Sequence, residues 1–310
     1  MQVRGISLNI DFLGKKNIAL IVSAILIVIS IASMAIRGLN LGIDFTGGTL
    51  VEVGYSDAVE LDPIRTALNN AQFPDAIVQH FGTAKDVLIR LPSVNDVNAS
   101  ELSNKVLSAL QPTGDLTMRR VEFVGPQVGE ELRDDGGLAV LYSLFGILIY
   151  VALRFEYRFA LGSVVALIHD VIITIGFFSV TQAEFDLTVL AAVLAVIGYS
   201  LNDTIVVFDR IRENFRRMRK RSAMEVINVS INQTISRTLV TSLTTLLVLL
   251  ALFFIGGEVI HSFALALILG VVVGTYSSIY IASAMLVLLK VTSEDLIPAE
   301  KDTEELDQIP

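Results

Sequence analysis

The 310-residue chain contains no cysteine and few charged side chains. Without cysteine it can form neither a disulfide framework nor a cysteine zinc site, and it has no thiol for catalysis. Charged residues make up 18% of the chain, whereas a soluble domain has about 25%. The formal net charge of −9 argues against nucleic acid as a partner.

The common catalytic signatures are missing as well. The sequence has no Gly-x-x-x-x-Gly-Lys phosphate loop and no His-Glu-x-x-His zinc helix. It also lacks the Gly-x-Ser-x-Gly turn that presents a nucleophilic serine. Nucleotide hydrolysis and the common hydrolase chemistries are therefore excluded, and we expect no enzyme activity, no cofactor and no metal site.

Apolar residues are present in excess: they make up 53% of the chain, and the mean hydropathy is +0.66. A helix needs about 20 mostly apolar residues to cross a bilayer. Six stretches meet or approach this length, at residues 18–36, 138–153, 159–180, 187–208, 238–255 and 263–289. The sequence thus predicts an α-helical membrane protein with six transmembrane helices.

Lysine and arginine are distributed unevenly among the connecting segments. They are concentrated in the segment 209–237, whereas 181–186 and 256–262 contain none. Because cytoplasmic loops carry the excess of basic residues, both termini should be cytoplasmic. The N-terminus would cover 1–17, and an acidic tail, expected to be largely disordered, would cover 290–310.

The long stretch 37–137 would then be extracytoplasmic, and it has the pattern of a folded domain. Alternating apolar residues predict four strands, and helical spacing predicts two helices between them. In chain order the strands are 49–55, 76–81, 87–91 and 116–124, and the helices are 61–71 and 99–110. The order β-α-β-β-α-β predicts a ferredoxin-like α+β domain.

Three ionisable residues lie within or beside the predicted spans: Asp170 in the third, Asp203 in the fourth and Arg237 at the start of the fifth. Ionisable residues in a bilayer are energetically costly and usually mark an ion pathway, a proton relay or an ion pair. The directions of the fourth and fifth spans place Asp203 and Arg237 at similar depth, so we expect them to form a pair. Asp170 is a further candidate for the relay.

Polar neighbours are predicted to support this pair. They are Ser200, Asn202 and Thr204 around the aspartate, and Thr241 one turn beyond the arginine. The alternative is that these charges only hold helices together or, for the arginine, extend to the membrane surface. His169 would then be a packing residue.

An aspartate beside an arginine suits energy coupling. Whether the carboxyl group holds a proton depends on the balance between burial and the neighbouring cation. A small helix shift changes that balance. One proton crossing the membrane is worth about 2.3 kcal/mol per 100 mV, which is enough to bias a bundle with two arrangements.

Two further features are less specific. Gly270, Gly274 and Ser278 form a ridge of small residues that favours close helix packing, within the bundle or against a partner. The basic run 210–221 is most simply an anchor on the cytoplasmic side, with contact to anionic lipid or a partner as the alternative.

Several segments together resemble the SecD/SecF family of bacterial and archaeal protein export, and within it the SecF members. They are residues 41–48 (LGIDFTGG), 123–129 (FVGPQVG), 197–204 (IGYSLNDT), 207–214 (VFDRIREN) and 234–238 (TISRT). The resemblance covers the chain apart from its two ends. Asp44, Gly47 and Gly48 belong to the first segment, for which we expect a tight turn.

The resemblance implies an RND-like half-transporter in the cytoplasmic membrane. Such a subunit pairs with SecD, associates with the SecYEG channel, often with YajC, and uses the proton-motive force to draw out unfolded exported polypeptide at a late, ATP-independent stage. It also implies that Asp203 and Arg237 serve proton passage, while it assigns no firm role to Asp170.

Two other functions are alternatives, and the sequence fits both of them poorly. An RND-type transporter half for small molecules or lipids would typically carry two large outer domains on a doubled chain. An intramembrane aspartyl protease would use Asp170 and Asp203, but its Gly-x-Gly-Asp signature is absent, and a cation beside one carboxylate would hinder proton sharing between the two.

Overall fold

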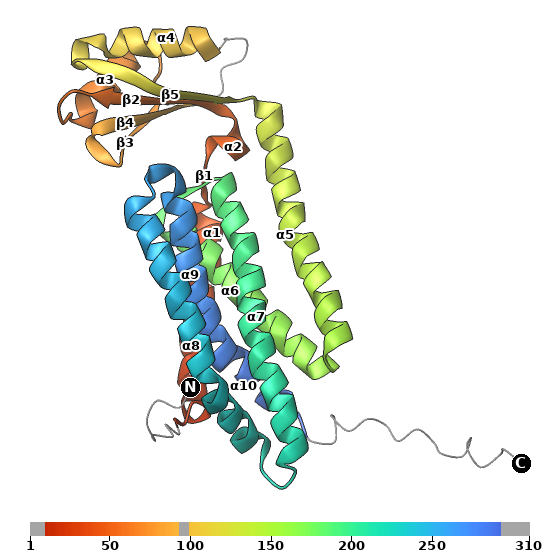
Figure 1. Ribbon diagram of the computed structural model, residues 1–310. Coiled ribbons are helices and arrows are strands. Elements are labelled where there is room, and N and C mark those ends of the chain that lie inside the picture. Colours follow the sequence, from red (N-terminus) through yellow and green to blue (C-terminus); the bar gives the residue numbers. More distant parts are fainter. Residues whose placement is uncertain (1–9, 93–98, 293–310) are drawn as a thin grey trace, which may run out of the picture.

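The computed structural model describes residues 10–92 and 99–292. These residues form a bundle of long helices with a small α+β domain at one end (Figure 1). Below, this end of the bundle is called the domain end, and the opposite end, where the arginines cluster, the basic end. Residues 1–9 and 293–310, which include most of the predicted acidic tail, lie outside the described residues.

Within the described residues, six helices are long and apolar enough to cross a membrane. Five are single helices, and the last one is built from two helices joined by a π-helical turn. They are α1 (Lys16–Arg37), α5 (Pro126–Arg154), α6 (Tyr157–Thr181), α7 (Leu187–Arg217), α8 (Ala223–Ile255), and α9 (His261–Ser277) continued by the turn Ser278–Ala282 and α10 (Ser283–Leu288).

Several helices are longer than the apolar runs that predicted them. The predicted basic segment 209–237 is largely helical, because α7 continues to Arg217 and α8 already begins at Ala223. Ser222 and Glu225 form a capping box at the start of α8. This pattern is a sequence signal for a helix start, but it lies outside the apolar run 238–255. Arg237 therefore lies inside a helix rather than at its beginning.

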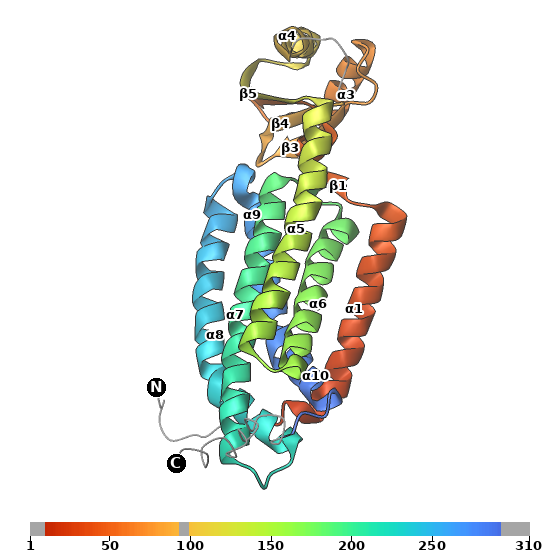
Figure 2. The same ribbon diagram turned by 90° about the vertical axis from the view of Figure 1, so that its right-hand side faces the viewer.

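The helices α6 and α7 form the centre of the bundle, and much of their surface is buried. The helix α1 packs beside α6, and α5 lies on the outside (Figure 2). Near the basic end, Phe155, Phe159 and Phe208 form an aromatic cluster. The outer helices expose apolar side chains, as expected for surfaces that meet lipid or another membrane subunit.

The α+β domain has the predicted ferredoxin-like order. Its elements are β2 (Gly48–Tyr55), α3 (Leu61–Asn70), β3 (Ile77–Phe81), β4 (Thr83–Leu91), α4 (Ala99–Leu110) and β5 (Leu116–Val124). The four strands form an antiparallel sheet in the order β3-β4-β2-β5. Strand β4 begins before the predicted strand because its pairing with β3 continues to Phe81 and Thr83.

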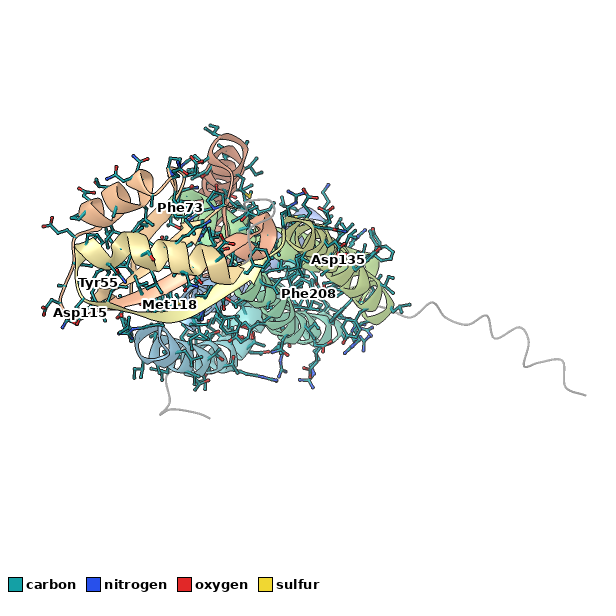
Figure 3. All side chains as sticks on the ribbon, turned by 90° about the horizontal axis from the view of Figure 1, so that it is seen from above. Tyr55, Phe73, Asp115, Met118, Asp135 and Phe208 are labelled. Carbon is teal, nitrogen blue, oxygen red and sulfur yellow. The ribbon has the colours of Figure 1, made fainter. Side chains whose placement is uncertain are left out.

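One face of the sheet carries the domain's core. Ile64 and Leu68 of α3 and Val106 of α4 pack onto this face, where Val51 and Ile89 stand opposite each other in neighbouring strands. Seen from above, α4 runs across the domain, with Tyr55 and Asp115 at one end of it and Phe208 among the helices below (Figure 3). The other face of the sheet therefore turns toward the bundle.

Three short elements connect the domain to the bundle, and none of them was predicted. The strand β1 (Asn40–Leu41) pairs in parallel with β6 (Glu184–Phe185), which lies between α6 and α7. The short helix α2 (Ile43–Thr46) follows β1. Two-residue strands carry no periodicity that a sequence can reveal, so only the folded chain shows this junction.

Candidate functional site

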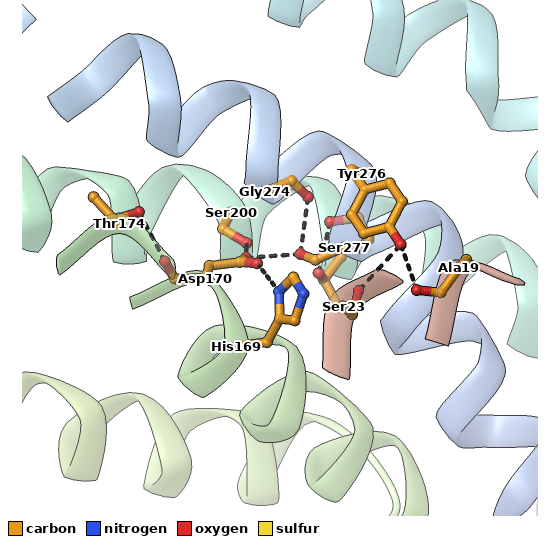
Figure 4. Close-up of polar contacts among 11 residues, drawn as sticks. Ala19, Ser23, His169, Asp170, Thr174, Ser200, Gly274, Tyr276 and Ser277 are labelled. Atoms are coloured by element: carbon orange, nitrogen blue, oxygen red, sulfur yellow. Dashed lines mark hydrogen bonds and ion pairs between the residues drawn. The ribbon is translucent and has the colours of Figure 1, made fainter. Parts of the chain in front are cut away.

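Asp170 lies at the centre of a buried polar cluster between α6, α7 and α9. One carboxylate oxygen, Oδ1, is 2.8 Å from Nδ1 of His169. The other, Oδ2, accepts hydrogen bonds from the hydroxyls of Ser200 at 2.5 Å and Ser277 at 2.7 Å (Figure 4). These four residues, called the Asp170 cluster below, are almost completely shielded from solvent. The carboxylate thus joins three helices.

The cluster continues toward α1 through Tyr276. The ring of Tyr276 stacks near His169, with centroids 6.2 Å apart. Its hydroxyl donates to the carbonyl of Ala19 at 2.8 Å and lies 3.1 Å from the hydroxyl of Ser23. Because polar groups inside a membrane need partners within the protein, this chain of contacts fixes four helices relative to one another.

The π-helical turn in the last span begins directly after Ser277. Its first residue, Ser278, contacts the hydroxyl of Thr204 on α7 at 2.9 Å. Single π-helical turns inside α-helices are frequent at functional sites. At this turn, two consecutive serines have different partners. Ser277 donates to Asp170, whereas Ser278 contacts Thr204, the residue next to Asp203.

Asp203 lies on α7 and is 3% exposed. Its Oδ2 atom is buried and has no hydrogen-bond partner within the described part of the chain. Arg237 on α8 lies within electrostatic range of this carboxylate, but among the described residues no ion pair joins the two. Arg237 itself is exposed on the surface of α8. Asp203 is thus a buried carboxylate within electrostatic range of an exposed cation with which it forms no ion pair.

Three of the four polar residues expected to support the pair of Asp203 and Arg237 bind other groups. Ser200 donates to Asp170, and Thr204 contacts Ser278. Asn202 is exposed. Thr241 donates to carbonyls of its own helix, that of Arg237 at 3.1 Å and that of Thr238 at 2.9 Å.

Sequence reasoning also overlooked two residues. Ser277 is one of the donors to Asp170, and its only signal was a polar residue next to Ser278 in an apolar span. Thr238 is buried on α8 next to Arg237, and its hydroxyl lacks a partner among the described residues.

The ridge of small residues on α9 faces α7. A Cβ atom on Gly270 would overlap with Val196, and one on Gly274 would lie 3.0 Å from Cβ of Ser200. Together with the Ser278–Thr204 contact, the ridge allows α9 and α7 to approach closely within the bundle. This close approach is what brings the hydroxyl of Ser277 to Asp170.

The segment containing Asp44, Gly47 and Gly48 lies at the junction below the α+β domain. Both glycines have positive φ angles, +68° and +135°, which glycine adopts most readily. Asp44 does more than form a turn, since its Oδ2 atom accepts the backbone N–H of Leu187, the first residue of α7, at 3.0 Å.

A metal site does not emerge from this arrangement. Among residues 10–92 and 99–292, no group of three or more histidine, aspartate or glutamate side chains could hold a metal ion.

Comparison with known proteins places this geometry in a family. Residues 104–292 match the model "Protein export membrane protein SecD/SecF, C-terminal", and residues 32–59 match "SecD/SecF GG Motif". The first match covers more than half of the chain. The chain therefore belongs to the SecD/SecF family of protein export membrane proteins.

Curated relatives identify the branch of the family. The chain is 53% identical over 306 residues to the protein translocase subunit SecF of Vibrio alginolyticus, with 97% of each chain covered. It is 43% identical over 301 residues to that of Escherichia coli O157:H7, covering 96% of this chain and 93% of the relative. It is thus a SecF subunit, a multi-pass membrane component of a translocase rather than an enzyme.

A solved structure shows the same fold. The crystal structure of SecDF from Thermus thermophilus, a translocon-associated membrane protein, aligns with a TM-score of 0.83 at 41% identity. The alignment covers 91% of this chain but 38% of the SecDF chain. This chain thus has the fold of one part of that SecDF protein, with six long helices and a small α+β region between the first two.

Proposed function

We propose that this SecF subunit couples proton movement to protein export through Asp203, with Arg237 as its charge partner. The observation that carries this proposal is the environment of Asp203. Its carboxylate is buried in a transmembrane helix, one oxygen has no hydrogen-bond donor among the described residues, and a cation lies within range without forming an ion pair.

These properties suit a group that takes up and releases a proton. A buried carboxylate oxygen without a donor is a place where a proton can be held, since protonation removes a charge that the bilayer does not solvate. When the guanidinium of Arg237 approaches, it stabilises the ionised form instead. Movement of α7 against α8 would therefore alternate the ionisation state of Asp203.

Asp170 fits a different role. Both of its carboxylate oxygens already have partners, and these partners hold α6, α7 and α9 together. We assign it to the rigid part of the bundle, against which α8 and its arginine can shift. The exposed position of Arg237 supports a site that is completed by the neighbouring membrane subunit, SecD.

We infer the orientation of the subunit in the membrane from its basic residues, and its further partners from its family. The basic residues at the end of α7 and in the turn before α8 favour a cytoplasmic basic end. The α+β domain would then lie outside the cytoplasmic membrane, where it would move during late, ATP-independent export of unfolded polypeptide. The SecYEG channel and YajC are the expected further partners.

The test is gradient-dependent export by inverted membrane vesicles that contain the complete complex. Asp203→Asn should assemble with SecD normally but lose the part of translocation that depends on the proton gradient. Arg237→Gln should lose the same part, whereas Arg237→Lys, which keeps a positive charge, should retain some of it.

Asp209→Asn serves as the matched control. Asp209 lies on the same helix, but it is half-exposed and paired with Arg154 at the basic end, so its loss should leave the gradient dependence unchanged. Normal gradient-dependent completion of export by Asp203→Asn would show that Asp203 does not carry the proton.

A further inference from the structure

The α+β domain contacts the domain end of the bundle at a few defined points. A cavity of about 490 Å³ lies between the two parts, lined by Leu50 and Leu88 of the sheet and by Glu184 and Glu258 of the bundle. The domain is therefore not packed flat onto the helices. Its position depends on the contacts around this cavity.

The first contact is made by Asp44, which α2 carries just before the chain enters the sheet through β2. Its carboxylate accepts the N–H of Leu187 at 3.0 Å, while Asp186 accepts the N–H of Val189 at 2.8 Å. The first N–H groups of a helix have no partner within the helix, and this end carries a partial positive charge. Asp44, which lies just before the first strand of the domain's sheet, therefore caps the N-terminus of α7.

The backbone around Gly47 holds Asp44 in place. A Cβ atom on Gly47 would lie 2.8 Å from Cα of Pro126, and one on Gly129 would lie 2.7 Å from the nitrogen of Gly47. The short helix α2 is thus pressed against the first turn of α5. Asp44 cannot leave α7 without a shift of the segment that begins β2.

The second contact is made by Arg90 on β4. One of its guanidinium nitrogens pairs with Oε1 of Glu184 at 2.5 Å, and another donates to the carbonyl of Leu41 at 3.2 Å. The two charged side chains are 10% and 22% exposed, respectively. Removing the guanidinium of Arg90 would be destabilising, because it would leave the largely buried carboxylate of Glu184 without compensation.

We propose that Asp44 and Arg90 are positioning residues that fix the α+β domain to the domain end of α7, so that helix and domain move as one body. The segment 41–48, whose physical role the sequence left open, then connects the α+β domain to α7. The attachment does not depend on which residue carries the proton, because its contacts involve neither Asp203 nor Arg237.

The test is a distance measurement by pulsed electron paramagnetic resonance on the complex with a cysteine-free SecD in lipid nanodiscs. The chain has no cysteine of its own, so spin labels attach only at introduced positions. One label is placed on the exposed α4 residue Asn104 and one on exposed Thr181 at the end of α6. Wild type should give one narrow distance peak, and Asp44→Ala and Arg90→Gln should each lose it to a broad distribution.

Three controls make the outcome specific. Asp44→Asn keeps a side-chain oxygen that can accept the N–H of Leu187, so it should keep the narrow peak. Asp62→Ala breaks an exposed ion pair with Arg65 within the domain, and it should also have no effect. A label pair inside the domain, Asn104 with Asn69, should stay narrow in every variant.

Two results would overturn the proposal. A narrow, unshifted peak in the double variant Asp44→Ala/Arg90→Gln would show that the domain is held by other contacts. Broadening of the internal pair in Asp44→Ala would show that Asp44 stabilises the domain itself rather than its attachment.

Discussion

The hydroxyl of Ser277 on α9 donates a hydrogen bond to Oδ2 of Asp170 on α6, at 2.7 Å. The same oxygen accepts from Ser200 on α7. One carboxylate oxygen of α6 thus binds both α7 and α9 inside the apolar part of the bundle. We therefore expect the Asp170 cluster to contribute to the stability of the bundle.

Asp170→Ala should lower the thermal stability of the purified complex. The substitution removes the acceptor of the buried Ser200 hydroxyl, whereas Ser277 keeps the carbonyl of Gly274 as a partner at 3.1 Å. A buried polar group without a partner costs about 1–3 kcal/mol. Asp170→Asn keeps one acceptor oxygen and should lose less. Thermal unfolding in detergent measures both.

The matched control for Asp170 is Asn202→Ala, which lies on α7 but is exposed. A substitution of this kind usually changes stability by less than about 0.5 kcal/mol. If Asp170→Ala unfolds at the wild-type temperature, the cluster does not stabilise the bundle.

Gly270→Leu should separate α7 from α9. Even a Cβ atom at this position would overlap with Val196, so a larger side chain forces the helices apart. Inserting extra volume into a packed core typically costs about 1–3 kcal/mol. The loss should appear as a lower unfolding temperature and as weaker contact between Ser277 and Asp170, which infrared spectroscopy of the carboxyl group detects.

Gly146 on α5 provides the comparison for Gly270, because a Cβ atom there would meet nothing within 4 Å. Gly146→Ala should be neutral or slightly stabilising, since alanine favours the helix over glycine. Equal effects of Gly270→Ala and Gly146→Ala would contradict the close approach of α7 and α9.

Acidification should strengthen the attachment of the α+β domain to the bundle. Burial raises the pKa of Glu184; Arg90 offsets this in part, while the charges of Asp186 and Asp44 add to it. A raised pKa means that the docked arrangement binds the proton more tightly than an arrangement in which Glu184 is exposed. Docking is then strongest below the ordinary pKa of a glutamate and weakens as pH rises through the raised value.

The measurement for Glu184 is the width of the Asn104–Thr181 label distance as a function of pH. Glu184→Gln keeps an oxygen for Arg90 but cannot ionise, so it should stay docked and lose the pH dependence. If the wild-type distance distribution broadens on acidification, the prediction that acid strengthens docking is wrong.

Local sequence patterns were sufficient for the main architecture. Uninterrupted apolar runs marked the six spans, and alternating residues marked β2 to β5 to within a few residues at most ends. The clearest misjudged boundary was the beginning of α8. There the charged and polar residues after Ser222 form good helix, although they are not apolar.

The candidate site was predicted only in part. The sequence singled out Asp203, Arg237 and Asp170 because ionisable residues stand out in apolar spans. It could not show that the hydroxyl of Ser200 binds Asp170 rather than Asp203. Asp203 lies one turn further along the same helix, whereas Asp170 lies on α6, and only the packing of α6 against α7 shows which carboxylate the hydroxyl reaches.

By itself, the sequence determined what depends on neighbouring residues along the chain: the number of spans, the ferredoxin-like order of the domain, and the identity of the ionisable residues within the membrane. The tertiary structure alone decided which of these groups meet. The hydrogen bond from Leu187 to Asp44 and the ion pair between Arg90 and Glu184 join segments far apart in sequence. Such contacts form only when helix packing brings specific faces together, and no local periodicity encodes them.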